Sequence, residues 1–243
     1  MIIDSHTHAD EAPTSGWLDP PEAMLKLMDE AGIDKAVVMT YVDARDEEPI
    51  DYISDSVARY PDRLVGYARI HPAGQRAEEL LELAVKGKGF QGLKLHPVSN
   101  LSHPADEATH RIVRKAAGLR VPVLFHCGDE PYTTPFELEH CVVAVPEAAV
   151  IFGHMGGYFH CGQAIQVAER RPNVYLETSA MPRPAMIRRA IEAVGAERVL
   201  FASDGPGCDP KLEIYKVERA GLSERERELI FSENILRLWA EGR

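Results

Sequence analysis

Two histidines stand only two positions apart near the start of the chain, in the run Asp4-Ser-His-Thr-His8. The apolar residues before them indicate a strand, on which successive side chains point to opposite faces. His6 and His8 therefore project from one face and can offer two imidazoles to the same metal ion. Two histidines can also share a strand face for packing alone, so a metal site requires further ligands elsewhere in the chain.

Ionisable side chains recur where other apolar runs end, at His96, His126, His154 and Asp204. Taken singly, each has an ordinary explanation as a core histidine, a turn residue or a helix cap. Taken together, they indicate a shared site at the ends of separate strands. Three neutral imidazoles and one carboxylate suit zinc, with manganese, iron or nickel as alternatives. Such a site is catalytic in type when one position is left for water.

Lys94 lies between two leucines in the run Gly92-Leu-Lys-Leu-His-Pro97. On a strand, Lys94 and His96 share one face, and Leu93 and Leu95 point the other way, toward the helices. An inward lysine is unfavourable unless it is paired, so we expect a functional role. Lys94 would bind a substrate carboxylate together with His96, or bridge two metal ions if it is carbamylated.

Eight short runs rich in Val, Ile, Leu and Phe indicate strands, namely Met1–His6, Lys35–Tyr41, Leu64–Ile70, Phe90–His96, Val121–His126, Ala149–Gly153, Asn173–Thr178 and Arg198–Ser203. Segments with helical spacing separate most of them, namely Pro20–Ala31, Ile50–Tyr60, Ala77–Val85, Asp106–Ala117, Pro135–Val145, Gly162–Arg170 and Pro184–Val194. Short apolar strands separated by helices are typical of a parallel sheet covered by helices. Eight such units in roughly 250 residues predict an α/β fold of the (β/α)8 TIM-barrel type.

We expect one domain spanning residues 1–243. An open doubly wound sheet is the alternative, but no Gly-x-Gly-x-x-Gly follows the first strand. In a barrel, the carboxyl ends of all strands meet at one rim, where active sites of this fold lie. The histidines and Asp204 would then converge there from distant parts of the sequence.

The remaining polar positions are less informative. Arg69, His71 and Glu177 lie in or beside strands, but the parity of a single short strand does not fix their direction. Four histidines fall in loops or helices, and we expect them at the surface: His103, His110, His140 and His160. The C-terminal segment predicts an amphipathic helix whose Leu236 and Trp239 pack on the barrel.

Composition narrows the class of partner. The 243 residues carry a formal net charge of −11 and are 45% hydrophobic, which allows a sizeable core and argues against nucleic acid. A small-molecule substrate is the expected partner. The four cysteines lie far apart without a CxxC pair, so we expect reduced thiols. No signal peptide or membrane span is evident, which favours a cytoplasmic protein that does not act at membranes.

An ordered set of motifs resembles the amidohydrolase superfamily, and within it amidohydrolase family 2, the branch that includes aminocarboxymuconate semialdehyde decarboxylases. The motifs are Asp4-Ser-His-Thr-His8, Gly92-Leu-Lys-Leu-His-Pro97, Phe125-His-Cys-Gly128, Gly153-His-Met-Gly-Gly157, Ser203-Asp-Gly-Pro206 and Ser232-Glu-Asn-Ile-Leu236. The resemblance implies that His6, His8, His126 and Asp204 hold one divalent metal ion, with zinc expected. It implies that His154 acts outside the ligand set, on the substrate or the attacking water. Relatives in this family are often dimers, so the resemblance implies that a homodimer is one of the expected states.

The resemblance and the site together favour metal-dependent hydrolysis of a lactone, ester or amide. Metal binding lowers the pKa of water from about 15.7 toward 7, and Asp204 would accept the proton as the water attacks. His154 would help to polarise the scissile carbonyl. A nonoxidative decarboxylase of a small aromatic or muconate-like acid is the alternative. A catalytically inactive barrel that serves as a binding protein is a third reading. The sequence does not identify the substrate, and the metal count depends on Lys94.

Overall fold

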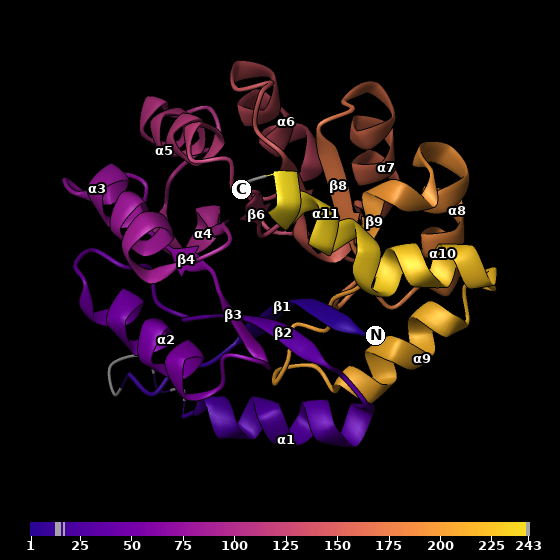
Figure 1. Cartoon of the computed structure of the whole chain (residues 1–243). Coiled ribbons are helices and arrows are strands. Elements are labelled where there is room, and N and C mark those ends of the chain that lie inside the picture. Colours follow the sequence, from indigo (N-terminus) through magenta and orange to yellow (C-terminus); the bar gives the residue numbers. More distant parts are fainter. Residues whose placement is uncertain (13–15, 17, 242–243) are drawn as a thin grey trace.

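The computed structural model describes residues 1–12, 16 and 18–241, and it forms a ring of parallel strands surrounded by helices (Figure 1). The strands are β1 (Ile3–His8), β2 (Lys35–Met39), β3 (Leu64–Gly66), β4 (Ala68–Arg69), β5 (Leu93–Leu95), β6 (Val123–Phe125), β7 (Val150–Phe152), β8 (Val174–Glu177) and β9 (Val199–Leu200). Hydrogen bonds join them in the orders β1-β2-β3 and β4-β5-β6-β7-β8-β9. The expected alternation of strands and helices is confirmed.

The two strand groups form one ring because β3 and β4 are a single strand interrupted at Tyr67. The backbone N–H of Tyr67 donates to the Val38 carbonyl on β2, and the N–H of Ala68 donates to the Gly92 carbonyl that precedes β5. The interrupted strand therefore pairs with β2 before Tyr67 and with β5 after it.

The opposite seam closes between β1 and the segment after β9. The N–H of Asp204 donates to the His6 carbonyl at 2.8 Å, and the N–H of His8 donates to the Gly205 carbonyl at 2.7 Å. These bonds complete the predicted (β/α)8 barrel and exclude the open doubly wound sheet. They also place the Asp204 backbone directly beside the two histidines of β1.

The helices are α1 (Pro21–Ala31), α2 (Glu48–Arg59), α3 (Ala77–Glu82), α4 (Pro97–Asn100), α5 (Glu107–Gly118), α6 (Pro135–Ala144), α7 (Cys161–Arg170), α8 (Pro184–Val194), α9 (Pro210–Glu218), α10 (Glu224–Glu228) and α11 (Asn234–Glu241). Four short segments complete the described set: η1 (Leu83–Gly87) and η4 (Leu229–Glu233) are π-helical, and η2 (Gly153–Gly156) and η3 (Ala196–Arg198) are 3-10 helical. Proline occupies the first turn of several helices, where its missing N–H leaves no hydrogen bond unmade. Among the described residues, α9 and α4 have no counterpart in the sequence prediction.

The barrel interior is filled at one end by a cluster that includes α11, which crosses the middle of the ring in Figure 1. Trp239 of α11 is buried, and its Nε1–H donates to the Tyr67 hydroxyl at 3.0 Å. Leu236 is 39% exposed, so the prediction that it packs on the barrel is wrong. Ile235 and Leu238 pack there instead, because they lie on the same helix face as Trp239.

Two sequence expectations need correction at the residue level. The first strand runs to His8 and not to His6, because its pairing with β2 continues past a register shift between Asp4 and Thr7. His140 is exposed as expected, but the remaining loop and helix histidines are half-buried: His103, His110 and His160.

All four cysteines are free, in line with the expected reduced thiols. In the described part of the chain, no helix is both long and apolar enough to span a membrane.

Candidate metal centre

The predicted histidines and Asp204 gather at the rim of the barrel that lies opposite α11. His6 and His8 end β1, and their rings lie 5.2 Å apart, which confirms that they share one strand face. The Nε2 atoms of both rings lie beside the same carboxylate oxygen: Oδ1 of Asp204 is 3.4 Å from His6 and 3.3 Å from His8. Three potential ligand atoms therefore converge from the two sides of the barrel seam.

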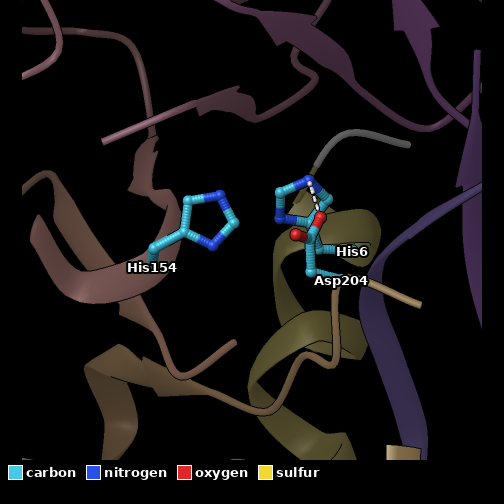
Figure 2. A group of neighbouring side chains, drawn as sticks. All are labelled: His6, His154 and Asp204. Atoms are coloured by element: carbon cyan, nitrogen blue, oxygen red, sulfur yellow. Dashed lines mark ion pairs between the residues drawn. The ribbon is translucent and has the colours of Figure 1, made fainter. Parts of the chain in front are cut away.

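His154 completes the cluster of ligand atoms that the structure brings together. His6, His154 and Asp204 each offer one such atom, and the three atoms lie within 4.8 Å of one another. Figure 2 shows the His154 ring facing His6 and Asp204 across the site. The resemblance had placed His154 outside the ligand set, so the structure adds it as a further candidate ligand.

His126, a predicted ligand, lies one imidazole further out. Its Nδ1 is 3.1 Å from Nε2 of His154, and its Nε2 is 3.3 Å from a carboxylate oxygen of Glu130. His96 stacks on the His126 ring at a centroid distance of 3.9 Å, and its Nδ1 accepts a hydrogen bond from the Ser99 N–H. His126 and His154 thus form a pair from which one ring can reach the metal position.

The predicted inward direction of Lys94 is confirmed. Its side chain is buried, and Nζ lies 2.7 Å from Nε2 of His6, whereas Leu93 and Leu95 pack in the core between strands and helices. Burial lowers the pKa of Lys94 to about 7, and the nearby Arg69 adds to the effect. The amine therefore sits inside the barrel next to a candidate metal ligand.

Arg69 is the second buried cation at this rim, and it pairs with Lys94 across the β4–β5 register. Its Nε donates to Asp43 at 3.0 Å, and one Nη donates to the Ser99 hydroxyl at 2.8 Å. His71, by contrast, uses its Nδ1 to accept the Ala73 N–H, which is the role of a turn residue.

Glu177 is the residue whose importance the sequence left open. It is fully buried inside the barrel, and it accepts the Nδ1–H of His6 at 2.8 Å and the backbone N–H of His154 at 3.0 Å. The Ser179 hydroxyl connects Glu177 with Nδ1 of His154, at 2.9 Å on each side. Sequence reasoning missed Ser179, because a serine in a loop carries no metal-ligand signature.

The protonation states of the cluster are those that a metal requires. Burial, the largest effect, lowers the pKa of His6 well below its usual value and also lowers that of His8. Burial lowers the pKa of His126 to about 4. Burial alone would raise the pKa of Asp204, but His6 and the hydrogen bond with His8 outweigh it and hold the pKa well below the usual range. Neutral imidazoles therefore face an ionised carboxylate at neutral pH.

The geometry also fits a single divalent ion. The Nδ1–H of His6 donates to Glu177, so Nε2 of His6 carries a lone pair that faces the Asp204 carboxylate at 3.4 Å. Lys94 lies 2.7 Å from this Nε2 and can offset the repulsion between the two acceptors, and a divalent ion held by both would do the same. Ligand atoms bound about 2.1 Å from one metal ion lie roughly 3.0–3.4 Å apart. The separations between Asp204 and the two histidines match that range.

The backbone at two of these residues adopts the left-handed region, which non-glycine residues seldom occupy. φ is 59° at His154 and 63° at Asp204. Such conformations are unfavourable and persist only where the surrounding structure enforces them, which occurs most often at functional sites. Both side chains are thereby turned from their strand ends toward the centre of the rim.

A cavity of about 420 Å³ lies around the loops that follow β1 and β2, and none of the candidate ligands is part of its described lining. Its described lining is Asp10, Glu11, Ala12, Thr40, Val42, Asp43, Arg45, Asp46, Glu48, Pro49 and Tyr52. Residues 13–15 and 17 of the loop that follows β1 lie outside the described residues. The cavity is large enough for a small organic molecule.

Comparison with known proteins identifies relatives of the whole chain. A family model described as amidohydrolase matches residues 3–240. No curated protein sequence matches the chain. Among solved structures, an uncharacterised TIM-barrel protein from Bordetella bronchiseptica aligns with a TM-score of 0.80 and 20% identity, over 99% of each chain.

Two similar structures are decarboxylases that contain manganese. Dihydroxybenzoic acid decarboxylase from Polaromonas, with bound manganese and the inhibitor 2-nitroresorcinol, has a TM-score of 0.77 and 21% identity over 100% of this chain and 97% of its own. 5-Carboxyvanillate decarboxylase from Novosphingobium aromaticivorans, complexed with manganese, has a TM-score of 0.80 and 16% identity over 99% and 96%. At these identities the likeness establishes the barrel fold.

Proposed function

Since this chain belongs to the amidohydrolase family, we propose that it is a metal-dependent nonoxidative decarboxylase of a small hydroxylated aromatic or muconate-like acid. The observation that carries the proposal is the convergence of His6, His8 and Asp204 beside the buried amine of Lys94. Two structural neighbours that contain manganese are decarboxylases of aromatic acids, which supports this chemistry over hydrolysis.

The proposed metal ligands are His6, His8 and Asp204, completed by one ring of the His126–His154 pair. When bound, the ion would supply electrostatic attraction for the substrate carboxylate and a neighbouring hydroxyl. The nitrogen and oxygen donors accept zinc or manganese, and two similar structures contain manganese. We propose one ion per chain, and a second ion would imply carbamylation of Lys94.

The chain's own side chains have separate roles in the proposed reaction. Lys94, with Arg69 behind it, offers positive charge to an anionic substrate, and His96 holds the His126 ring in place by stacking. His154, protonated on both nitrogens, would deliver its Nε2 proton to the carbon that bears the carboxylate, and a proton from water would restore it after the reaction. In this role His154 is not a metal ligand, so His126 is the ring that completes the ligand set. The bond between that carbon and the carboxylate then breaks, its electron pair returns to the ring, and carbon dioxide leaves. The substrate loses carbon dioxide and gains one proton, so charge and atoms balance.

Hydrolysis remains the second candidate, because Asp204 lies where it could take a proton from a water molecule held among the histidines. A binding protein without turnover is the third. Both readings use the same ligand set, so only product analysis separates them. A small-molecule partner, a homodimer and a cytoplasmic location likewise stay predictions.

The test loads the purified protein with Mn²⁺ or Zn²⁺ and measures carbon dioxide release from a panel of dihydroxybenzoates, 5-carboxyvanillate and muconate-like acids. Lactone and amide hydrolysis are measured in parallel. Decarboxylation that is inhibited by 2-nitroresorcinol and abolished in His154→Asn supports the proposal. Hydrolysis without carbon dioxide release would replace it with the second candidate, and binding without either reaction would favour the third.

A further inference from the structure

We infer that Glu177 is a positioning residue that fixes the tautomer and orientation of two imidazoles at once, His6 directly and His154 through Ser179. The inference rests on the proposed function and deepens it, since it identifies what prepares the histidines for the metal. Glu177 does not itself reach the metal position in this proposal. It acts from the interior side of β8, below the rim.

The contacts of His6 define its tautomer. Glu177 is a carboxylate and only accepts, so the His6 nitrogen that faces it, Nδ1, must carry the proton. In a neutral ring Nε2 then carries the lone pair, which is aimed at the position where Asp204 also points. Lys94, beside Nε2, can donate as an ammonium or accept as a neutral amine, so Glu177 is the partner that decides the tautomer.

The same carboxylate reaches His154 by two routes. Its Oε1 accepts the His154 backbone N–H, which holds the residue in its left-handed conformation. Oε1 also accepts the Ser179 hydroxyl proton, so the Ser179 oxygen is left to accept the Nδ1–H of His154. The proton of a neutral His154 ring is thereby held on Nδ1, and its Nε2, which lies 3.1 Å from Nδ1 of His126, carries the lone pair. Glu177 thus orients both rings from one buried position.

The burial of Glu177 indicates that its hydrogen bonds do more than connect neighbouring strands. The residue is 0% exposed, and a carboxylate removed from water is costly unless every oxygen is hydrogen-bonded. Its other oxygen accepts the Ser179 N–H at 2.6 Å, so both oxygens are occupied. An apolar residue would bridge the interior without that desolvation, but it could not select a histidine tautomer. Partners that orient metal-bound histidines in this way typically contribute about 10–100-fold to metal affinity.

The first experiment measures the tautomers in the metal-free protein, by long-range ¹H–¹⁵N NMR of ¹⁵N-histidine-labelled samples. Signals are assigned from their loss in His6→Asn and His154→Asn. We expect the Nδ1–H pattern for His6 in the native protein and its loss in Glu177→Met. Ser179→Ala should leave the His6 pattern intact and change only that of His154. A His6 pattern that is unchanged in Glu177→Met overturns the inference.

The second experiment titrates Mn²⁺ and Zn²⁺ into metal-free protein by calorimetry. Glu177→Met should weaken binding about 10–100-fold, whereas Glu177→Gln, which keeps one acceptor oxygen, should recover part of that loss. Glu169→Met, at an exposed position on α7, is the matched control and should bind like the native protein. Binding by Glu177→Met within twofold of the native value contradicts the inference.

The experiments distinguish a variant that fails to fold from one that folds but has lost the proposed role. Circular dichroism checks each variant, and if Glu177→Met does not fold, Glu177→Gln and Ser179→Ala decide the question through the same two measurements. If the native protein binds neither metal, the proposed function fails, yet the tautomer measurement still tests Glu177. If metal binds but no substrate is decarboxylated, only the reaction needs revision.

Discussion

Asp204 combines three properties. Its backbone is left-handed, the pKa of its carboxyl group is held well below the usual range, and one of its carboxylate oxygens lies beside the imidazoles of both His6 and His8. Its backbone N–H also donates to the His6 carbonyl across the seam. The side chain therefore serves the site, while the main chain serves the barrel. A mutation of the side chain can therefore remove its role in the site and leave the backbone hydrogen bond at the seam in place.

We predict that Asp204→Asn abolishes turnover and leaves the barrel folded. The amide keeps the size of the side chain but removes the negative charge that a divalent ion needs. A loss of roughly 10³-fold in kcat/KM is the expected scale for an electrostatic group at a reacting centre. The measurement is kcat/KM, with metal content determined on the same sample.

Asp62→Asn, at an exposed position, is the matched control and should retain native kinetics and metal content. Circular dichroism should be the same for both variants and the native protein. Activity of Asp204→Asn within tenfold of the native value would refute its role in the site.

Residues whose chemistry is visible in their type and position could be predicted from the sequence. His6 and His8 lie at the end of β1 and Asp204 lies shortly after β9, and strand ends meet at one rim in a barrel, so their convergence could be predicted from their positions in the sequence. Ser179 could not be predicted, because its role depends on the distance between Glu177 and His154. Glu177 was visible as a polar residue in an apolar strand, but parity in one short strand was ambiguous.

At the scale of elements, the barrel depends on close packing between β3–β4 and the start of β5. Gly92 lies beside the buried Tyr67 ring, and a Cβ atom at position 92 would lie only 2.3 Å from it. Tyr67 cannot move aside easily, since its hydroxyl also accepts the Trp239 indole N–H of α11. One glycine thus allows the strand, the ring and the C-terminal helix to fit together.

We predict that Gly92→Ala destabilises the protein by at least about 1–3 kcal/mol, the usual range for overpacking a filled core. Gly118→Ala is the matched control, because the last residue of α5 has no neighbour within 4 Å of an added Cβ. Alanine there should be neutral or stabilise by about 0.5–1 kcal/mol. Urea unfolding measures both. Equal stability of the Gly92 variant and the native protein would contradict this account of the packing.

The elements themselves were predictable in type and less so in extent. The helix Pro184–Val194 has the predicted bounds, because proline and glycine mark its ends in the sequence. Predicted strands were longer than the observed ones at β6 and β9, since apolar character continues into residues that leave the ladder. α9 was missed, because its exposed Leu212 and Tyr215 blur the apolar stripe that identifies a surface helix.

At the scale of the whole molecule, the core determines the reactivity of the four thiols. Burial raises the pKa of Cys141 and of Cys161 to about 12, and that of Cys127 well above its usual value. Cys208 is half-buried, and burial raises its pKa to about 11. Only thiolates react quickly with disulfide reagents. All four side chains should therefore be slow in the folded protein.

We predict that DTNB at pH 8 modifies the native protein slowly and modifies four thiols rapidly once the protein is unfolded in guanidinium chloride. Cys208→Ser should remove most of the residual native reactivity, because the other three cysteines are fully buried. Rapid modification of two or more thiols in the native protein would mean that the core opens far more often than this packing allows.

The proposed metal position also has a consequence for global stability, because its ligands lie on both sides of the barrel seam. His6 and His8 belong to β1, and Asp204 follows β9, so one ion bound by all three would hold the two ends of the strand ring together. The unfolded chain does not bring these residues together. Metal binding should therefore stabilise the folded state of the whole barrel and not the rim alone.

We predict that metal at 100 times its dissociation constant stabilises the native protein by about 2.7 kcal/mol relative to the chelated form. For a chain of this size, each kcal/mol raises the melting temperature by about 2–4 °C, so a shift of about 5–10 °C is expected. Differential scanning calorimetry with and without Mn²⁺ or Zn²⁺ measures the shift. Asp204→Asn should lose most of it, whereas Asp62→Asn should keep it. An equal shift in both variants would place the stabilising ion elsewhere on the protein. No shift in metal-saturated native protein would mean that the unfolded chain binds the metal as tightly as the folded one, which contradicts a site formed across the seam.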